Sequence, residues 1–479
     1  MPVTSNTKPT PVQGDGTAAI TTTGARMPLT TTIRIRLRVP ARLRNLELVL
    51  LIIACGIVAF AIILVQLGAL GHVDPTVITL AAGLAVLALV MHVVLRVVAP
   101  QADPLILPIA TLINGIGIAE IYRIDIASGV SGWGSAGIRQ ILWTAIAIAI
   151  AIAVLIIVRN HRVLQRYSYI AMIVGIALLL LPMLPGIGRT INGARVWIGV
   201  GPFSFQPGEL GKVALAIFFA GYLVTARDSL SMVGRKVLRL TLPRARDLGP
   251  ILVVFAASMA VLIFQRDLGT SLLYFGLFLV MLYVATGRAS WIIIGLLLFA
   301  GGAVAVYKLV PYVDGRVQAW LNPFSNTNYN ATGGSYQLVQ GIFGLAHGGI
   351  LGTGLGLGAP QKTPLAASDF IFDSLGEELG LVGIFAILAL YLLFVSRGLR
   401  VGFTGQDDFG RLLGVGLAFT IAIQCFIVIG GVTRVIPLTG LTTPFLAAGG
   451  SSLVANWIIA ALLLRLSDTV RSGPAVMRT

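Results

Sequence analysis

Three acidic side chains recur at intervals of four residues in the C-terminal half of the chain: Asp369, Asp373 and Glu377. In a helix, residues at this spacing share one face. Carboxylates stacked in this way repel one another unless they meet cations or take up protons. A solvated loop face is the simpler alternative, but the aromatic and aliphatic residues at 370–372 argue against full exposure. The pattern therefore favours a functional carboxylate.

A charged pair stands at the predicted start of another helix. Pro207 suits the first turn of a helix, and Glu209 and Lys212 follow it three residues apart, on one helical face. One interpretation is an ion pair between the two side chains. A second, compatible with the first, is that they line a polar cavity in which Lys212 faces an anionic substrate. Ionisable groups at membrane depth are costly, so both residues are candidates for function.

Two more charged residues lie next to apolar segments. Arg195 is close to Trp197, an aromatic type that is enriched at membrane interfaces. Because a guanidinium group matches phosphate in a bidentate geometry, Arg195 is a candidate phosphate ligand. Asp267 stands in a short connection between two apolar segments, and we expect it to cap the helix that follows.

The elements that position these residues are predicted from composition. Hydrophobic residues make up 57% of the chain and charged residues 11%, and the mean hydropathy is +0.93. These values indicate an all-α, polytopic membrane protein. With about 20 mostly apolar residues for each crossing, the sequence predicts twelve spans, at 46–70, 75–98, 103–123, 137–158, 168–184, 209–226, 248–265, 268–286, 290–310, 379–396, 412–432 and 445–465.

The basic residues predict the orientation of these spans. Two basic clusters lie on the same side of the membrane if both termini are cytoplasmic, which agrees with the positive-inside rule. They comprise Arg34, Arg36, Arg38, Arg42 and Arg44, and Arg235, Lys236, Arg239, Arg244 and Arg246. Residues 1–45 are predicted to form a basic, disordered N-terminal tail in the cytoplasm, and residues 467–479 are predicted to form a cytoplasmic C-terminal tail. The net charge of +16 then points to membrane lipids with anionic headgroups, not to nucleic acid.

A long polar connection and two cysteines complete the pattern. Residues 311–378 form a large loop that the same topology places outside the cell, and unstructured loops of such length are uncommon unless they are functional. The glycine-rich run at 348–358 is interpreted as a series of tight turns. Cys55 and Cys425 lie in apolar segments without metal-site spacing, so no disulfide framework and no zinc site is predicted.

Ordered motifs between residues 103 and 466 resemble the SEDS family of shape, elongation, division and sporulation proteins, which includes the RodA and FtsW branches. Together the motifs are highly specific, and the segment from Arg434 to Ser452 looks more like the RodA branch. They are Asn192-Gly193-Ala194-Arg195 with Trp197, Gln206-Pro207 with Glu209 and Lys212, Asp267-Leu268-Gly269-Thr270-Ser271, Tyr336-Gln337 with Gln340, Asp369-Phe370-Ile371-Phe372 with Gly376-Glu377-Glu378-Leu379-Gly380, and Pro437-Leu438-Thr439-Gly440 with Pro444-Phe445 and Gly449-Gly450-Ser451-Ser452.

The resemblance implies an activity: polymerisation of lipid II into peptidoglycan glycan strands at a bacterial inner membrane. It implies that Asp369 is the catalytic base. The candidates for binding the pyrophosphate are, in order of preference, Arg195, Lys212 and Arg316, with Glu209 beside Lys212. Asp267, Asp373 and Glu377 remain structural or secondary candidates. A divalent cation is compatible with this chemistry, but the residue pattern offers no metal ligands.

The resemblance also implies an architecture and a partner. Family members commonly have ten spans, so residues 99–466 form the family core and residues 46–98 add two helices in front of it. The partner that the family implies is a class B penicillin-binding protein. A lipid II flippase, a transporter with a similar number of spans, is the leading alternative function.

Overall fold

The computed structural model describes residues 39–191, 193–200, 203–231, 236–237, 240–241, 248–331 and 333–472. Most of the predicted N-terminal tail and residues 473–479 of the predicted C-terminal tail therefore lie outside the described residues. The first helix begins at Val39, earlier than the predicted first span at residue 46. The last helix extends to Ser472, past the predicted end of its span at residue 465.

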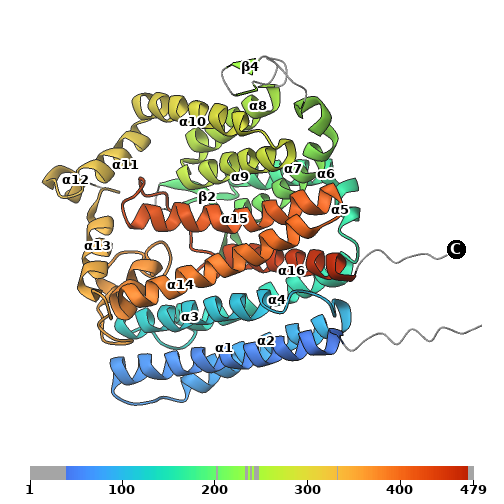
Figure 1. The fold of residues 1–479 in the computed structure, drawn as a ribbon. Coiled ribbons are helices and arrows are strands. Elements are labelled where there is room, and N and C mark those ends of the chain that lie inside the picture. The colour runs from blue at the N-terminus through green and yellow to red at the C-terminus, as the bar shows by residue number, and fades with distance from the viewer. Residues whose placement is uncertain are drawn as a thin grey trace, which may run out of the picture. The chain divides into compact units, whose positions relative to one another are not determined.

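Long helices dominate the described chain and run alongside one another in Figure 1. Each predicted span coincides with a helix, and ten helices in the described residues are long and apolar enough to cross a membrane. They are α1 (Val39–Leu70), α2 (Thr76–Val98), α3 (Ile106–Ala127), α4 (Ala136–Ile157), α7 (Pro207–Ser231), α9 (Leu268–Thr286), α10 (Ala289–Leu309), α14 (Ile371–Thr404), α15 (Asp408–Val432) and α16 (Gly450–Ser472).

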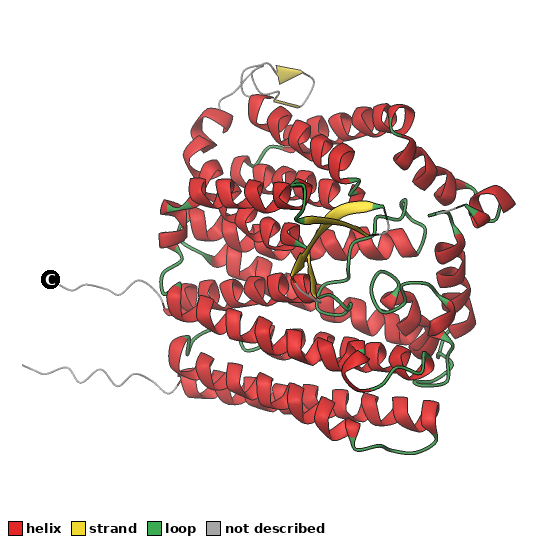
Figure 2. Cartoon of the chain, turned by 180° about the vertical axis from the view of Figure 1, so that it is seen from behind, coloured by secondary structure: helices red, strands yellow, loops and turns green. Residues whose placement is uncertain are grey.

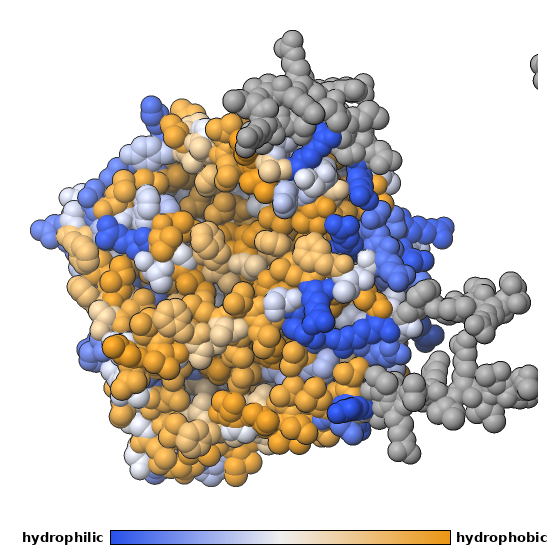
Figure 3. Space-filling model, in the orientation of Figure 1, coloured by the Kyte–Doolittle hydropathy of each residue, from blue (hydrophilic) through white to orange (hydrophobic). Residues whose placement is uncertain are grey.

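The predicted number of twelve spans is not confirmed, because two of the apolar helices are shorter. They are α6 (Ser168–Leu180), followed by the short 3-10 turn η2 (Leu181–Met183), and α8 (Gly249–Gln265). At 1.5 Å rise per residue, neither reaches the roughly 20 residues that cross a bilayer unaided. The face of the molecule in Figure 3 is mainly hydrophobic, as expected for a surface that contacts lipid.

A small antiparallel sheet follows α6 and was not predicted (Figure 2). It consists of β1 (Gly188–Ile191), β2 (Ala194–Val200) and β3 (Phe203–Phe205), with β2 in the centre. Ile191 pairs with Ala194, so a two-residue turn joins β1 to β2. A second pair of short strands, β4 (Lys236–Val237) and β5 (Leu240–Thr241), lies between α7 and α8.

The large loop that the sequence predicted at 311–378 is mostly helical. It contains α11 (Pro311–Leu321), α12 (Asn326–Asn330), α13 (Tyr336–Gly348) and the short turn η4 (Pro360–Lys362). In Figure 1 these helices lie at one end of the bundle, and the described chain finishes at the other end. Two shorter elements lie on earlier connections: η1 (Gly132–Gly134) between α3 and α4, and α5 (Arg162–Arg166) between α4 and α6.

The first two helices, α1 and α2, pack against α3 and the glycine-rich loop through both apolar and polar contacts. Val58, Ile62 and Val65 of α1 form a buried cluster with side chains of α2 and α3. The Gln66 side chain donates a hydrogen bond of 2.9 Å to the Tyr122 hydroxyl. At Gly68, α1 approaches the glycine-rich loop so closely that a Cβ atom would lie 2.4 Å from a backbone oxygen of that loop.

Helix α14 is broken at Gly380, where the backbone has φ 66° and ψ −170°. The glycine-rich segment 349–354 hydrogen-bonds to both sides of the break. The amides of Leu381 and Val382 donate to carbonyls at 349 and 350, at 3.0 and 3.2 Å. The carbonyls of Glu377 and Glu378 accept from amides at 353 and 354, at 3.0 and 2.9 Å. The sequence alone predicts a series of tight turns for this glycine run. In the structure it supplies hydrogen-bond partners for the backbone groups that the break in α14 leaves unpaired.

Replacing Gly380 with alanine is expected to lower the melting temperature of the purified protein. The observed backbone angles are almost restricted to glycine, and forcing another residue into them costs about 1–3 kcal/mol. In addition, the new Cβ would lie 2.2 Å from the Gly352 amide nitrogen. Gly301→Ala in α10 is the matched control, because no atom lies within 4 Å of its Cβ position. Equal melting temperatures for the two variants would contradict the assigned strain.

Candidate active site

Asp369 lies in the turn immediately before α14, at the end of the bundle that carries α11 to α13. The amides of Ser368 and Phe370 both donate to the Leu365 carbonyl, at 3.0 and 3.2 Å, which fixes the turn. The Asp369 side chain is half-buried. A Cβ atom on Gly440 would lie 3.8 Å from its Oδ2, so the carboxylate faces the loop that connects α15 to α16.

The surroundings of Asp369 alter its acidity. Burial raises the pKa of this carboxyl to about 6, while a hydrogen bond from Ser368 and the charge of Arg316 oppose the rise. The negative charge of Asp267 adds to it. Two residues from distant parts of the chain, Arg316 and Asp267, therefore act electrostatically on Asp369. Three of the predicted residues are thus close enough to interact electrostatically.

Arg316 and Asp267 are held by their own elements. Arg316 lies on α11, and its guanidinium carbon is 5.5 Å from the centre of the Tyr312 ring. Asp267 caps α9, because its Oδ1 accepts from the Thr270 amide at 2.8 Å and its Oδ2 accepts from the Thr270 hydroxyl at 2.5 Å. The cap predicted from sequence is confirmed.

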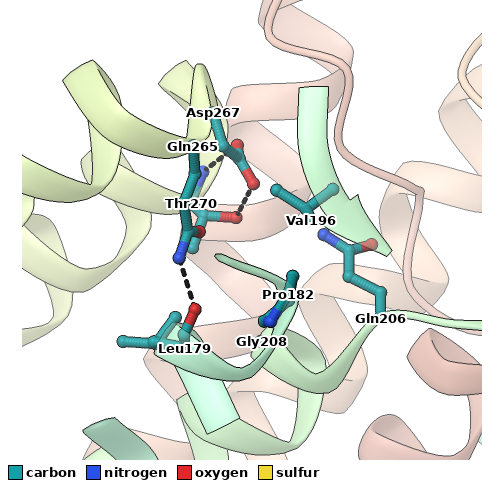
Figure 4. Close-up of a pocket in the computed structure, with 8 residues that line it drawn as sticks. All are labelled: Leu179, Pro182, Val196, Gln206, Gly208, Gln265, Asp267 and Thr270. Carbon is teal, nitrogen blue, oxygen red and sulfur yellow. Dashed lines mark hydrogen bonds between the residues drawn. The ribbon is translucent and has the colours of Figure 1, made fainter. Parts of the chain in front are cut away.

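A small pocket lies beside Asp267 (Figure 4). Its volume of about 10 Å³ is enough for one water molecule. Gln206 and Val196 border it on the side of the β-sheet, and Asp267 with Thr270 border it on the side of α9. The Gln265 side chain donates to the Leu179 carbonyl across one edge. The pocket joins the sheet, the start of α7 and the α8–α9 connection at one place.

The Glu209–Lys212 pair is buried inside the bundle. The Lys212 Nζ lies 2.6 Å from Glu209 Oε2, and only 2% and 5% of the two side chains is exposed. The same Nζ donates to Gln424 Oε1 at 2.7 Å and to Asn456 Oδ1 at 3.1 Å. All three donors of the ammonium group are therefore used. The predicted ion pair is confirmed, and Lys212 does not face an open cavity in this structure.

Arg195 lies on β2 and is half-buried. Its Nε donates to the Pro182 carbonyl at 3.2 Å and its Nη2 to the Leu184 carbonyl at 3.4 Å. These bonds are long, and they hold the strand against the turn that ends α6. The structure therefore places Arg195 on the same sheet that borders the small pocket, next to Val196.

Asp373 and Glu377 lie on the first segment of α14, whereas Asp369 precedes that helix. The three carboxylates therefore do not form one stripe on a single helix. Asp373 is 1% exposed, and neither of its carboxylate oxygens has a hydrogen-bond partner among the described residues. It points at α13, since a Cβ on Gly341 would lie 2.2 Å from its Oδ2.

Glu377 belongs to a charged network that sequence reasoning missed in part. Its Oε1 accepts from the Ala359 amide at 3.0 Å and lies 3.1 Å from His347 Nδ1. The adjacent Glu378 forms an ion pair of 2.8 Å with Arg123 on α3. Arg123 is a charged residue within a predicted span, which was the available signal for this network. Among the described residues, no three His, Cys, Asp or Glu side chains are placed to hold a metal ion.

Comparisons with known proteins agree with the fold and the motifs. The sequence model of the FtsW, RodA and SpoVE family, described as "Cell cycle protein", matches residues 103–472. Peptidoglycan glycosyltransferase RodA of Mycobacterium tuberculosis is 45% identical over 434 residues, which cover 89% of this chain and 91% of that protein. A probable peptidoglycan glycosyltransferase FtsW of Geobacter metallireducens is 33% identical over 317 residues, 66% of this chain and 80% of that protein.

A solved structure gives the same result at the level of the fold. It is described as "Structural coordination of polymerization and crosslinking by a peptidoglycan synthase complex", and its matching chain has a TM-score of 0.52 and 25% sequence identity. The match covers 81% of this chain and 96% of that one. The resemblance inferred from the motifs is thus confirmed, and the chain belongs to the FtsW, RodA and SpoVE family of cell cycle proteins.

Proposed function

We propose that this protein is a peptidoglycan glycosyltransferase that polymerises lipid II, with Asp369 as the general base. The observation that carries the proposal is a half-buried carboxylate whose pKa is raised to about 6. A general base works best when its pKa lies near the working pH. The family membership and the names of the relatives support the same reaction.

The proposed reaction transfers a sugar from one lipid-linked molecule to another. The 4-hydroxyl of the acceptor attacks the anomeric carbon of the donor, and the bond from that carbon to the pyrophosphate oxygen breaks. The hydroxyl proton passes to Asp369, and the electron pair of the broken bond stays on the leaving polyprenyl pyrophosphate. Positive side chains are needed where this negative charge develops.

Arg195, Lys212 and Arg316 are the proposed groups for the pyrophosphate. Arg316 is supported by its electrostatic effect on Asp369, and Arg195 by its position on the sheet beside the small pocket. Lys212 reaches the substrate only if its bonds to Gln424 and Asn456 give way, because its three donors are already used. Glu209 then serves to hold the ammonium group in place.

We assign the protein to cell elongation, because its identity with a RodA protein (45%) exceeds that with an FtsW protein (33%). The proposed partner is a class B penicillin-binding protein, in line with the synthase complex to which the fold is similar. The proposed location is the bacterial inner membrane, with both termini in the cytoplasm and Asp369 outside. A lipid II flippase remains the competing function.

Polymerisation in detergent separates the enzyme from the flippase. A detergent micelle does not separate two aqueous compartments, so no transport can be observed in it. A glycosyltransferase still joins lipid II molecules under these conditions. We expect the purified chain, with a class B penicillin-binding protein added, to produce glycan strands visible on a gel. The same partner without this chain is the control. Absence of polymer, together with lipid II crossing in proteoliposomes, would replace our proposal with the flippase.

The rate of polymerisation is expected to depend on pH through Asp369. Since its pKa is raised to about 6, the carboxyl is protonated below that pH and no longer accepts a proton. We therefore expect kcat/KM to fall about tenfold for each pH unit below about 6 and to level off above it. Initial rates between about pH 5 and about pH 8 test this. A rate that does not change with pH in this range would show that protonation of Asp369 does not limit polymerisation.

A further inference from the structure

A second polar pocket lies at the opposite end of the bundle from Asp369. Its volume is about 240 Å³, and it is lined by the ends of α14 and α16 together with the segment that leads into α3. Three arginines take part in the lining: Arg397 and Arg400 on α14 and Arg471 on α16. This pocket is much larger than the water-sized space beside Asp267, and the proposed mechanism does not use it.

The pocket carries more positive than negative charge. Asp103 is the acidic side chain in its lining, and its Oδ2 accepts from Arg397 Nη2 and from Arg471 Nη2, both at 2.6 Å. One carboxylate thus serves two guanidinium groups. Arg400 is exposed, and no hydrogen bond or ion pair of its guanidinium occurs within the described part of the chain. Three positive charges face one negative charge, which leaves the pocket suited to an anion.

The rest of the local charges do not neutralise this surplus. Asp468 lies on the neighbouring turn of α16, but it is 3.5 Å from Arg465 and also accepts from the Gln101 amide at 2.8 Å. The Asp103 Oδ1 accepts from the Leu105 amide at 3.0 Å, and the Asp103 amide donates to Ser467 Oγ. The charge of Asp468 is therefore balanced by Arg465, and that of the nearby Glu47 by Arg44. Asp103 is left to balance the arginines of the pocket, and the Arg400 guanidinium is available.

The surroundings of the pocket are those of a lipid-facing surface. Phe403, on the same turn of α14 as Arg400, is 55% exposed, and Leu392, which precedes Arg400 on that helix, is 71% exposed. Side chains of this kind lie against acyl chains in a membrane protein. In Figure 3, hydrophilic residues gather at the end of the bundle where the described chain finishes, next to the hydrophobic face. A molecule with an anionic headgroup and acyl chains fits both features.

We propose that this pocket binds the phosphodiester headgroup of an anionic phospholipid, with Arg400 contacting the phosphate. Arginine matches phosphate oxygens in a bidentate geometry, and basic pockets between transmembrane helices are typical sites for such headgroups. The exposed apolar side chains of α14 favour a lipid over free phosphate. In the orientation proposed above, the pocket opens to the cytoplasmic leaflet, where anionic lipids are enriched. This site is separate from the polymerisation site.

Lipid titration of the full chain in detergent, followed by native mass spectrometry, tests the proposal independently of enzymatic activity. We expect phosphatidylglycerol to bind about tenfold more tightly than phosphatidylcholine, and Arg400→Gln to weaken phosphatidylglycerol about fivefold. Arg400→Lys should retain most of the affinity, since the charge remains. Arg162→Gln is the matched control, because it removes an exposed arginine from α5.

Two outcomes would overturn the proposal. The first is equal binding of phosphatidylglycerol by wild type and Arg400→Gln, both correctly folded by their melting temperatures. The second is displacement of phosphatidylglycerol by millimolar inorganic phosphate alone, which would make the pocket a site for free phosphate. If the wild-type chain binds phosphatidylglycerol as expected but does not polymerise lipid II, the lipid site stands and the proposed enzymatic function is wrong.

Discussion

Asp369→Asn is expected to reduce the rate of glycan polymerisation from lipid II by about 10²- to 10⁴-fold. Asparagine is nearly isosteric with aspartate but has no basic oxygen that can take the proton from the acceptor hydroxyl. The side chain is half-buried and faces Gly440, so the substitution preserves its size and its surroundings. We would measure initial rates with purified protein, an added class B penicillin-binding protein and lipid II in detergent.

The control for this variant comes from the same end of the bundle (Figure 1). Asp314→Asn on α11 removes a carboxylate that, among the described residues, accepts a hydrogen bond from the Gln318 side chain alone, at 3.4 Å, and the variant is expected to keep a rate near that of wild type. Melting temperature and partner binding show whether both variants are folded. If Asp369→Asn polymerises as fast as Asp314→Asn, another group is the base, and the assignment of Asp369 is wrong.

The helices were predictable because the bilayer imposes a simple rule on the sequence. Twenty apolar residues in a row have few alternatives to a membrane helix, since every backbone group must be satisfied within the segment. Asp267 was predictable for a local reason, because a cap depends on the next three residues only. The two shorter helices show the limit of the rule: apolar composition alone does not distinguish a span from a helix that is too short to cross.

The β1–β2 hairpin had a signal that the search for spans did not use. Asn192-Gly193 stands between residues that the structure pairs, Ile191 and Ala194. Asn-Gly is the strongest short-range indication of a two-residue hairpin turn, and Gly193 has the positive φ, 81°, that such a turn requires. The prediction from sequence used this motif only for Arg195. Reading it for backbone geometry as well predicts the strand on which that arginine lies.

The site itself depends on contacts that no local pattern contains. Glu378 pairs with Arg123, which lies 255 positions earlier in the chain. Lys212 meets Gln424 and Asn456 from two other helices. Sequence reasoning found most of the charged residues, because charges in apolar surroundings stand out. It could not find their partners, since these are chosen by helix packing.

Lys212→Met is expected to lower the free energy of unfolding by about 3–5 kcal/mol. Methionine resembles lysine in length and fills the same space, but it leaves the Glu209 carboxylate buried without its counter-charge. The side-chain oxygens of Gln424 and Asn456 also lose their donor. The loss of stability is measured on the purified protein in detergent, by denaturant titration or from the melting temperature. A variant as stable as wild type would show that the buried carboxylate does not need the lysine.

The double variant Lys212→Met with Glu209→Gln separates the structural role of Lys212 from a role in substrate binding. Removing both charges eliminates the unpaired carboxylate, so most of the lost stability should return. If polymerisation returns with it, Lys212 stabilises the fold and does not bind pyrophosphate. If the double variant is stable and partner-bound but inactive, the ammonium group is needed by the reaction itself. That result would mean that Lys212 leaves Gln424 and Asn456 when the substrate binds, because the described structure leaves it no free donor.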